Sequence, residues 1–453
     1  MHPVNARTGG QQAPFRSGSG LARPPRTRTA AFVLLAVLLT ACTAPAAVTP
    51  PTAVPPNAVP HSSAAAPTTS SGTSGGQSRS GAPIISGSVT GPGATWSQTP
   101  ARAPAPGSST SGMKAGSPPL NVYLHAGSNM LSEQVKHFPA YAYVPHNKSG
   151  DVWVIDQRSH RVVRKCLVGT ELQHVVPSYD LRTLYATSDQ GNRLLVIDPA
   201  TGKCGRIIPV IDPYNLYFTP DGRSAISVAE ARRELVWYTP KTFTMTDTTA
   251  LPGCAGVDHA DFSADGATAV FTCEFDGRVA VVDVRTHRVL RMVDMPVRNM
   301  MMGPQDIKLA PDAHCYYIAD SDANGVWVLD AAATRVVRFI PTGRGAHGLY
   351  LSRDSRRLFV TNRLEGSISV LDAALGTVEA KWQIPGGGSP DMGNVNADGS
   401  QLWVSGRYHK VVYVLSTTNG RLLTKIPVGD GPHGMALMPI PGRYSLGHTG
   451  ITR

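Results

Sequence analysis

The chain has 453 residues and a formal net charge of +11. Residues 1–118 contain eight Lys or Arg and no Asp or Glu, so they hold +8 of this charge and leave +3 for the rest of the chain. The positive charge therefore describes an N-terminal arm and gives no support for nucleic-acid binding, which needs basic residues gathered on a folded surface. Only residues 119–453, rich in Val, Ile, Leu and Tyr, can form a large hydrophobic core.

An apolar segment, residues 30–39, follows an arginine-rich stretch near the N-terminus. Ten residues span about 15 Å as a helix, half of a bilayer core, which indicates a signal-peptide h-region rather than a membrane span. The segment runs into Leu39-Thr40-Ala41-Cys42, which resembles the lipobox of bacterial lipoproteins. We therefore expect a signal peptide over residues 1–41 and a lipid anchor on Cys42 that holds the exported protein on the outer face of the cell membrane. The alternative is an ordinary secretory signal cut near Ala44-Pro45-Ala46.

Residues 42–118 consist almost wholly of Ala, Pro, Ser, Thr, Gly and Val. Such a segment cannot bury enough apolar surface to offset the entropy lost on ordering. We expect a disordered tether with a root-mean-square reach of about 45–50 Å.

One pattern recurs through the remainder of the chain: a β-rich run that closes in an aliphatic residue and Asp, then a turn and another β-rich run. The closing positions, two of them degenerate, are Asp156, Asp198, Thr239, Asp283, Asp330, Asp372 and Ser416. Repeats of about 43 residues match the four-stranded blade of a β-propeller. The sequence therefore predicts an all-β, seven-bladed β-propeller over residues 119–440, followed by a tail, residues 441–453, that the repeat does not explain.

One unit shows how a blade is encoded. Residues 348–352, 357–362, 367–372 and 377–384 alternate apolar and polar side chains and are separated by Gly, Asp or Asn. Period-two alternation between turn residues predicts four antiparallel strands, the first of them lining the central channel.

The second strands carry related motifs, such as Phe359-Val360-Thr361-Asn362 and Trp403-Val404-Ser405-Gly406, and Pro432-His433-Gly434 is associated with them. These motifs resemble the YVTN family of seven-bladed propellers and, more closely, the bacterial YncE-like lipoproteins and secreted propellers. The resemblance implies the fold over about residues 137–440. It implies no single activity, because one fold carries many functions.

The two ends of the repeat indicate how the ring closes. The first unit begins at residues 140–144 without an inner strand before it, whereas residues 432–438 form an inner strand with no blade after it. We expect the last strand to complete the first blade, which removes an open sheet edge. Residues 121–124 are expected on the same blade or on the last one.

Two sets of polar residues are expected to converge on one mouth of the channel. The first set lies at the starts of the inner strands: His174, Asn215, Asp258, His259, Asp306, His347, Asp391 and His433. The second set lies in the loops after the second strands: His146, Asp189, Glu230, Glu274, Asp320, Arg363 and Arg407. Such groups can bind a ligand or a metal. The alternative is that they bond neighbouring blades to one another.

The second set divides the mouth into an acidic arc on blades two to five and a basic arc on blades six and seven. This division suits a small zwitterionic or sugar-like ligand or an oriented peptide, whereas the alternative is Arg–carboxylate pairing without a ligand. We therefore expect a ligand- or protein-binding scaffold with no catalysis and no cofactor. The alternative is an enzyme or accessory factor at the mouth, either a metal-dependent lactonase or hydrolase or a holder of noncovalent d1-type haem.

Two cysteines of the fourth unit are placed to pair. Cys254 precedes its inner strand and Cys273 ends its second strand. Antiparallel pairing brings those ends together, so we expect a disulfide in this exported protein. The alternative is two reduced, buried cysteines.

Overall fold

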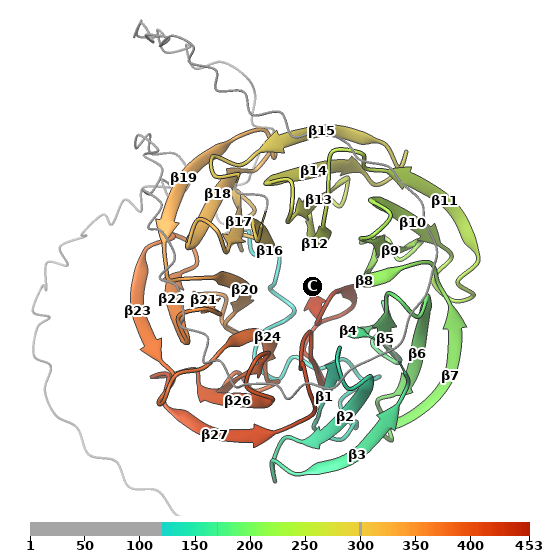
Figure 1. The fold of residues 1–453 in the computed structure, drawn as a ribbon, viewed down its shortest axis with the longest axis vertical. Helices are drawn as coiled ribbons and strands as arrows, with labels where there is room; N and C mark the ends of the chain where they lie inside the picture. The colour runs from blue at the N-terminus through green and yellow to red at the C-terminus, as the bar shows by residue number, and fades with distance from the viewer. Residues whose placement is uncertain (1–119, 170, 299–300) are drawn as a thin grey trace, which may run out of the picture. The chain divides into compact units, whose positions relative to one another are not determined.

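A computed structural model describes residues 120–169, 171–298 and 301–453. These residues form 30 β-strands and contain no α-helix, and the strands build seven antiparallel sheets around a central channel (Figure 1). The all-β, seven-bladed propeller predicted from the repeat is confirmed. Within the same residues no helix has the length and apolar character needed to cross a membrane.

The strands follow the blades in chain order. Blade 1 contains β1 (Tyr141–His146), β2 (Asp151–Asp156) and β3 (Val162–Leu167). Blade 2 contains β4 (Leu172–Pro177), β5 (Leu184–Ser188), β6 (Arg193–Asp198) and β7 (Lys203–Pro209). Blade 3 contains β8 (Pro213–Phe218), β9 (Ala225–Ala229), β10 (Glu234–Tyr238) and β11 (Met245–Ala250). Blades 4 and 5 contain β12 (Val257–Phe262), β13 (Thr268–Cys273), β14 (Arg278–Asp283), β15 (Val289–Asp294); and β16 (Pro304–Leu309), β17 (Cys315–Asp320), β18 (Gly325–Asp330), β19 (Val336–Pro341). Blades 6 and 7 contain β20 (Ala346–Leu351), β21 (Arg357–Asn362), β22 (Ser367–Asp372), β23 (Val378–Gln383); and β24 (Pro390–Val395), β25 (Gln401–Gly406), β26 (Val411–Ser416), β27 (Leu422–Pro427). The C-terminal strands are β28 (Ala436–Met438), β29 (Ser445–Gly447) and β30 (Ile451–Thr452).

The last inner strand closes the ring. Strand β28 pairs antiparallel with β1, with Met438 opposite Tyr141 and Ala436 opposite Tyr143. The first blade therefore joins both ends of the repeat, as predicted, and its inner edge is not left open.

The segment before the first blade lies elsewhere than expected. Residues 121–124 form turns rather than a strand of the first or last blade. The buried hydroxyl of Tyr123 donates to the carbonyl of Leu309 at 2.9 Å, and the amide of Val122 donates to the carbonyl of Pro311 at 2.9 Å. The prediction was wrong because β28 already occupies the inner edge of the first blade, while a buried phenol requires a hydrogen-bond partner, which blade 5 supplies.

The tail fills the channel. Strands β29 and β30 form a hairpin that extends blade 3 to six strands, with Gly447 opposite Tyr217 of β8, and Figure 1 shows the C-terminus at the centre of the ring. Gly447 has φ of +103°, and a Cβ there would lie 2.3 Å from the carbonyl oxygen of Leu216. Only glycine allows the hairpin to approach β8 this closely. The buried Arg453 then holds Asp261 at 2.8 Å.

Two disulfides join cysteines that both lie in the described part of the chain. Cys254 and Cys273, the pair expected from the sequence, are joined with their Cα atoms 4.7 Å apart. Cys166 and Cys204 are also joined, and this bond links β3 of blade 1 to β7 of blade 2. The repeat gave no indication of the second pair, because its cysteines lie in outer strands of different blades.

Candidate functional site

Irregular pairing at the start of the inner strands positions the polar residues of the channel mouth. In β12 the register with β13 shifts between Val257 and Ala260, so Asp258 and His259 lie outside the regular ladder. The corresponding shifts in other inner strands fall between Leu172 and Val175, Pro304 and Ile307, Ala346 and Leu349, and Pro390 and Gly393. Bulges redirect side chains at the rims of sheets, and in each of these five blades the bulge contains at least one polar residue of the predicted site.

A hydroxyl of the second strand stabilises each of four bulges. It accepts a hydrogen bond from a backbone amide of the bulge, and the pairs are Thr187 with His174, Thr272 with His259, Thr361 with Gly348, and Ser405 with Met392. The hydroxyl is the third residue of the second-strand motif, as in Phe359–Asn362. The motif from which the fold is recognised therefore also supports the site.

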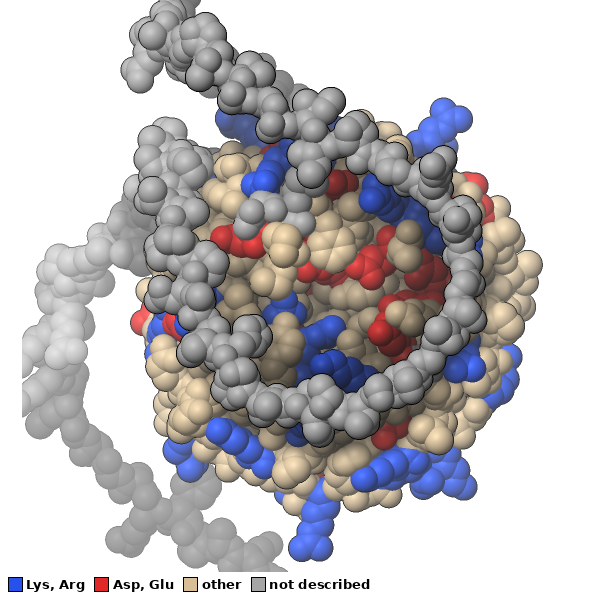
Figure 2. Space-filling view, in the orientation of Figure 1, with Lys and Arg blue, Asp and Glu red and all other residues tan. Residues whose placement is uncertain are grey.

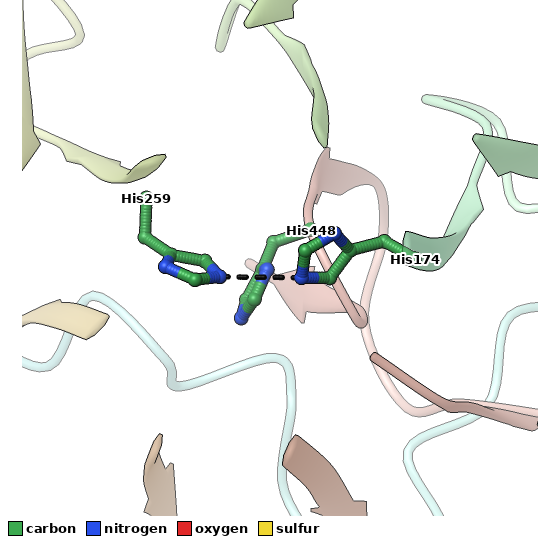
Figure 3. A group of neighbouring side chains, drawn as sticks. All are labelled: His174, His259 and His448. Atoms are coloured by element: carbon green, nitrogen blue, oxygen red, sulfur yellow. Dashed lines mark hydrogen bonds between the residues drawn. The ribbon is translucent and has the colours of Figure 1, made fainter. Parts of the chain in front are cut away.

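Three histidines from distant parts of the chain meet in the channel (Figure 3). The Nε2 atoms of His174 and His259 are 3.2 Å apart, and the ring centroids of His259 and His448 are 4.5 Å apart. One ring nitrogen of each histidine lies within 4.8 Å of the others. Burial lowers the pKa of His174 and His448 well below the usual range and that of His259 to about 4. All three rings are therefore neutral near pH 7, the form that can bind a metal ion.

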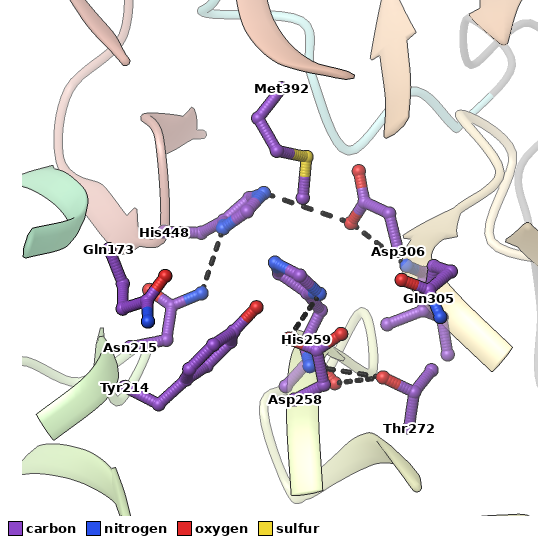
Figure 4. Close-up of polar contacts among 12 residues, drawn as sticks. Gln173, Tyr214, Asn215, Asp258, His259, Thr272, Gln305, Asp306, Met392 and His448 are labelled. Carbon is purple, nitrogen blue, oxygen red and sulfur yellow. Dashed lines mark hydrogen bonds and ion pairs between the residues drawn. The ribbon is translucent and has the colours of Figure 1, made fainter. Parts of the chain in front are cut away.

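His448 is a channel residue that the repeat does not indicate. It lies at the turn of the C-terminal hairpin, where its Nδ1 receives a hydrogen bond from the amide nitrogen of Asn215 at 2.9 Å (Figure 4). Its Nε2 lies 3.8 Å from Asp306. Asn215 and Asp306, two of the predicted site residues, thus lie beside His448, which the folded C-terminal tail brings into the channel.

Asp391 is the centre of a second group. Its Oδ1 lies 3.2 Å from His347 Nδ1 and 3.1 Å from Arg363 Nη1. Its Oδ2 lies 3.6 Å from Arg407 Nη1 and 3.7 Å from His433 Nε2. The Asp391 and Arg363 side chains are 0% and 7% exposed, whereas the Arg407 side chain is 20% exposed. Arg363 is therefore mainly a partner of a buried carboxylate, while Arg407 retains hydrogen-bonding capacity toward the mouth.

Figure 2 shows a hollow with acidic side chains, in red, on one side and basic side chains, in blue, on the other. Burial, together with the neighbouring carboxylates, raises the pKa of Glu230 to about 9. Burial, with the charge of Asp258, raises the pKa of Glu274 to about 7. The side chain of Asp258 is 1% exposed, and its Oδ1 lies 2.8 Å from Nδ1 of His259. The carboxyl groups of the acidic arc therefore either remain protonated or need hydrogen-bond donors beside them.

One predicted site residue does not join the mouth. Asp320 accepts hydrogen bonds from the indole of Trp327 at 3.0 Å and from the amide of Ala323 at 2.9 Å. Burial raises its pKa to about 7. Both of these hydrogen bonds lie within blade 5, so the Asp320 carboxylate stabilises a turn of that blade. The acidic arc is therefore formed without Asp320.

Comparison with known proteins agrees with this architecture. Residues 303–441 match the family model of the YNCE-like beta-propeller, and no curated protein matches the chain. A functionally unknown protein from Desulfotomaculum acetoxidans DSM 771 is 14% identical, with a TM-score of 0.56 over 66% of this chain and 98% of that chain. Dihydro-heme d1 dehydrogenase NirN, solved in complex with DHE, is 12% identical, with a TM-score of 0.51 over 65% and 74% of the two chains. At these identities the similarity shows the fold alone.

Seven antiparallel blades, closed by pairing of the last inner strand with the first blade, define a seven-bladed β-propeller. The family match covers blades 5 to 7 and the closing strand. The chain is thus a seven-bladed β-propeller whose last three blades and closing strand match the model of the YNCE-like beta-propeller family.

Proposed function

We propose that the protein is an exported propeller, anchored through Cys42, that binds a small polar ligand at the channel mouth and acts as a binding scaffold. The observation that carries the binding proposal is a set of buried polar atoms without hydrogen-bond partners on both sides of the mouth. They are Oδ1 of Asp189, Oδ2 of Asp391 and Nη1 of Arg407. Each such atom costs about 1–3 kcal/mol, and a bound ligand would supply the missing partners.

The chemistry of the two arcs specifies the class of ligand. Arg407 offers hydrogen-bond donors and a positive charge, which suit a carboxylate. Asp258, Glu230 and Glu274, on the opposite side, suit an amine or several hydroxyl groups. The ligand therefore carries a carboxylate at one end and amine or hydroxyl donors at the other, as amino acids, peptide termini and hexuronic acids do.

The anchoring part of the proposal depends on sequence. The lipobox-like residues Leu39–Cys42 and the predicted tether over residues 42–118 all lie outside the described residues. Export agrees with the two disulfides of the propeller, since disulfides persist in oxidising compartments.

Substitution of the two arginines tests the binding site. With free amino acids and hexuronic acids as probes, we expect at least one to raise the Tm of the full chain and to bind in calorimetry. Arg407→Ala should abolish that binding while the Tm without probe stays within about 5 °C of wild type, because its pairing is long and partly exposed. Arg363→Ala should instead lower the Tm markedly, because it leaves the buried Asp391 without its closest guanidinium. If Arg407→Ala binds every probe as wild type does, the mouth is not the ligand site.

A further inference from the structure

We propose that His174, His259 and His448 form a binding site for one divalent transition-metal ion, of the zinc or copper class, in the channel. The three histidines come from blade 2, blade 4 and the C-terminal hairpin. This site goes beyond the proposed ligand binding, because it does not depend on Arg363 or Arg407.

The hydrogen bonding of His174 directs a lone pair into the site. Its Nδ1 lies 2.9 Å from the carbonyl oxygen of Tyr214. A carbonyl only accepts, so Nδ1 carries the proton, and in the neutral ring Nε2 is unprotonated. Histidines that bind metals are oriented in this way, with the second ring nitrogen donating to a carbonyl or a carboxylate.

His259 has the corresponding arrangement with a carboxylate. Its Nδ1 lies 2.8 Å from Oδ1 of Asp258, and both side chains are almost fully buried. A carboxylate at this nitrogen favours a proton on Nδ1, which leaves the lone pair on Nε2. The Nε2 atoms of His174 and His259 then face each other at 3.2 Å with two lone pairs, a repulsive contact unless a cation or a proton lies between them.

The spacing fits a metal ion. Two nitrogens bound to one tetrahedral zinc ion at about 2.0–2.1 Å are about 3.3 Å apart, close to the 3.2 Å between these Nε2 atoms. His448 provides the third ligand from the tip of the hairpin, after its ring turns away from Asn215. Imidazole nitrogens suit zinc, copper, nickel and iron. Three protein ligands leave a fourth position for water or a ligand, the pattern of an open zinc site.

The charges around the three rings favour a cation at this site rather than at the neighbouring group. Asp306, Glu274 and Asp391 act on His259 in the attractive sense for a cation, whereas Lys308 opposes them there and Arg407 opposes a cation at His174. The second group, His347, Asp391 and His433, also has metal-binding atom types within reach of one another. There, however, Arg363 and Arg407 already lie 3.1 and 3.6 Å from the Asp391 oxygens, and two guanidinium charges repel a metal ion.

Metal titration of matched histidine variants tests the proposal. The purified full chain is stripped with a chelator and titrated in a calorimeter with ZnCl2 and with CuCl2. We expect one equivalent to bind. His174→Gln and His259→Gln should each weaken binding by at least about 10–100-fold, whereas His347→Gln, a buried histidine of the other group, should leave it unchanged.

Spectroscopy of the wild-type chain makes the test independent of how the variants fold. One equivalent of CoCl2 should give the visible absorption of a low-symmetry, nitrogen-ligated ion, and a chelator should remove it. Arg407→Ala should retain metal binding even if it abolishes binding of the organic ligand, so the two proposals can fail separately. Lack of stoichiometric binding by wild type, or equal weakening by His347→Gln, would overturn the site and leave the contact between His174 and His259 as a hydrogen bond.

Discussion

At the scale of residues, burial changes the chemistry of the mouth more than composition suggests. Glu230 and Glu274 are ordinary carboxyl groups in the sequence, yet burial raises their pKa values to about 9 and about 7. Burial lowers the pKa values of the channel histidines for the same reason, because it disfavours the charged form of either kind of group. The mouth at neutral pH is therefore less charged than its residue types indicate.

This shift predicts a pH dependence of stability. A carboxyl group with a pKa of about 9 when folded and an ordinary value of 4.5 when unfolded binds a proton preferentially in the folded state between those values. The contribution of Glu230 to the free energy of unfolding should therefore decrease as the pH rises across that range. Glu230→Gln, which cannot ionise, should flatten the dependence, measured by urea unfolding at several pH values. Glu379→Gln, at an exposed pair with Arg357, is the control, and equal slopes for wild type and Glu230→Gln would contradict the prediction.

At the scale of elements, the sequence predicts what repeats and cannot predict what occurs once. The strands and turns of every blade follow from alternation and from the Gly, Asp and Asn at the bends, and the position of His259 in the channel follows from its place in the repeat. The C-terminal hairpin occurs once, and Gly447 pairs with Tyr217, more than 200 residues away. Neither periodicity nor spacing links those residues, so the contribution of His448 to the channel could not be foreseen.

Arg453 should be the main electrostatic attachment of this hairpin. Its guanidinium donates to Asp261 and to the carbonyl of Phe262, both at 2.8 Å, and is buried. Arg453→Ala should reduce the free energy of unfolding by about 3–5 kcal/mol, measured by chemical denaturation, because a buried carboxylate loses its counter-charge.

The control for this variant is Arg335→Ala. Arg335 is 79% exposed and lies 3.8 Å from Asp330, so its loss should cost less than about 1 kcal/mol. Adding Asp261→Asn to Arg453→Ala should recover part of the lost stability. If Arg453→Ala costs no more than Arg335→Ala, the pair with Asp261 does not hold the tail.

At the scale of the whole molecule, the two faces of the propeller have different roles. Inner strands begin at the mouth face, where their bulges gather the polar residues, and end at the opposite face. The first described residues reach that opposite face, because Val122 bonds Pro311 in the turn after β16. The described chain therefore enters the propeller on the face opposite the mouth.

Replacing Cys42 tests the proposed lipid anchor. Cys42→Ser removes the thiol that would carry the acyl chains, and stable membrane attachment needs two lipid chains or their equivalent. We expect this variant to leave the membrane fraction or to remain unprocessed, as followed by fractionation and by mass spectrometry of the mature N-terminus. Thr40→Ser, which keeps a small residue before the cysteine, should be processed and anchored like wild type. Processing and fractionation of Cys42→Ser like wild type would instead favour an ordinary secretory signal cut near Ala44-Pro45-Ala46, and the propeller would then act as a free exported protein with the same mouth.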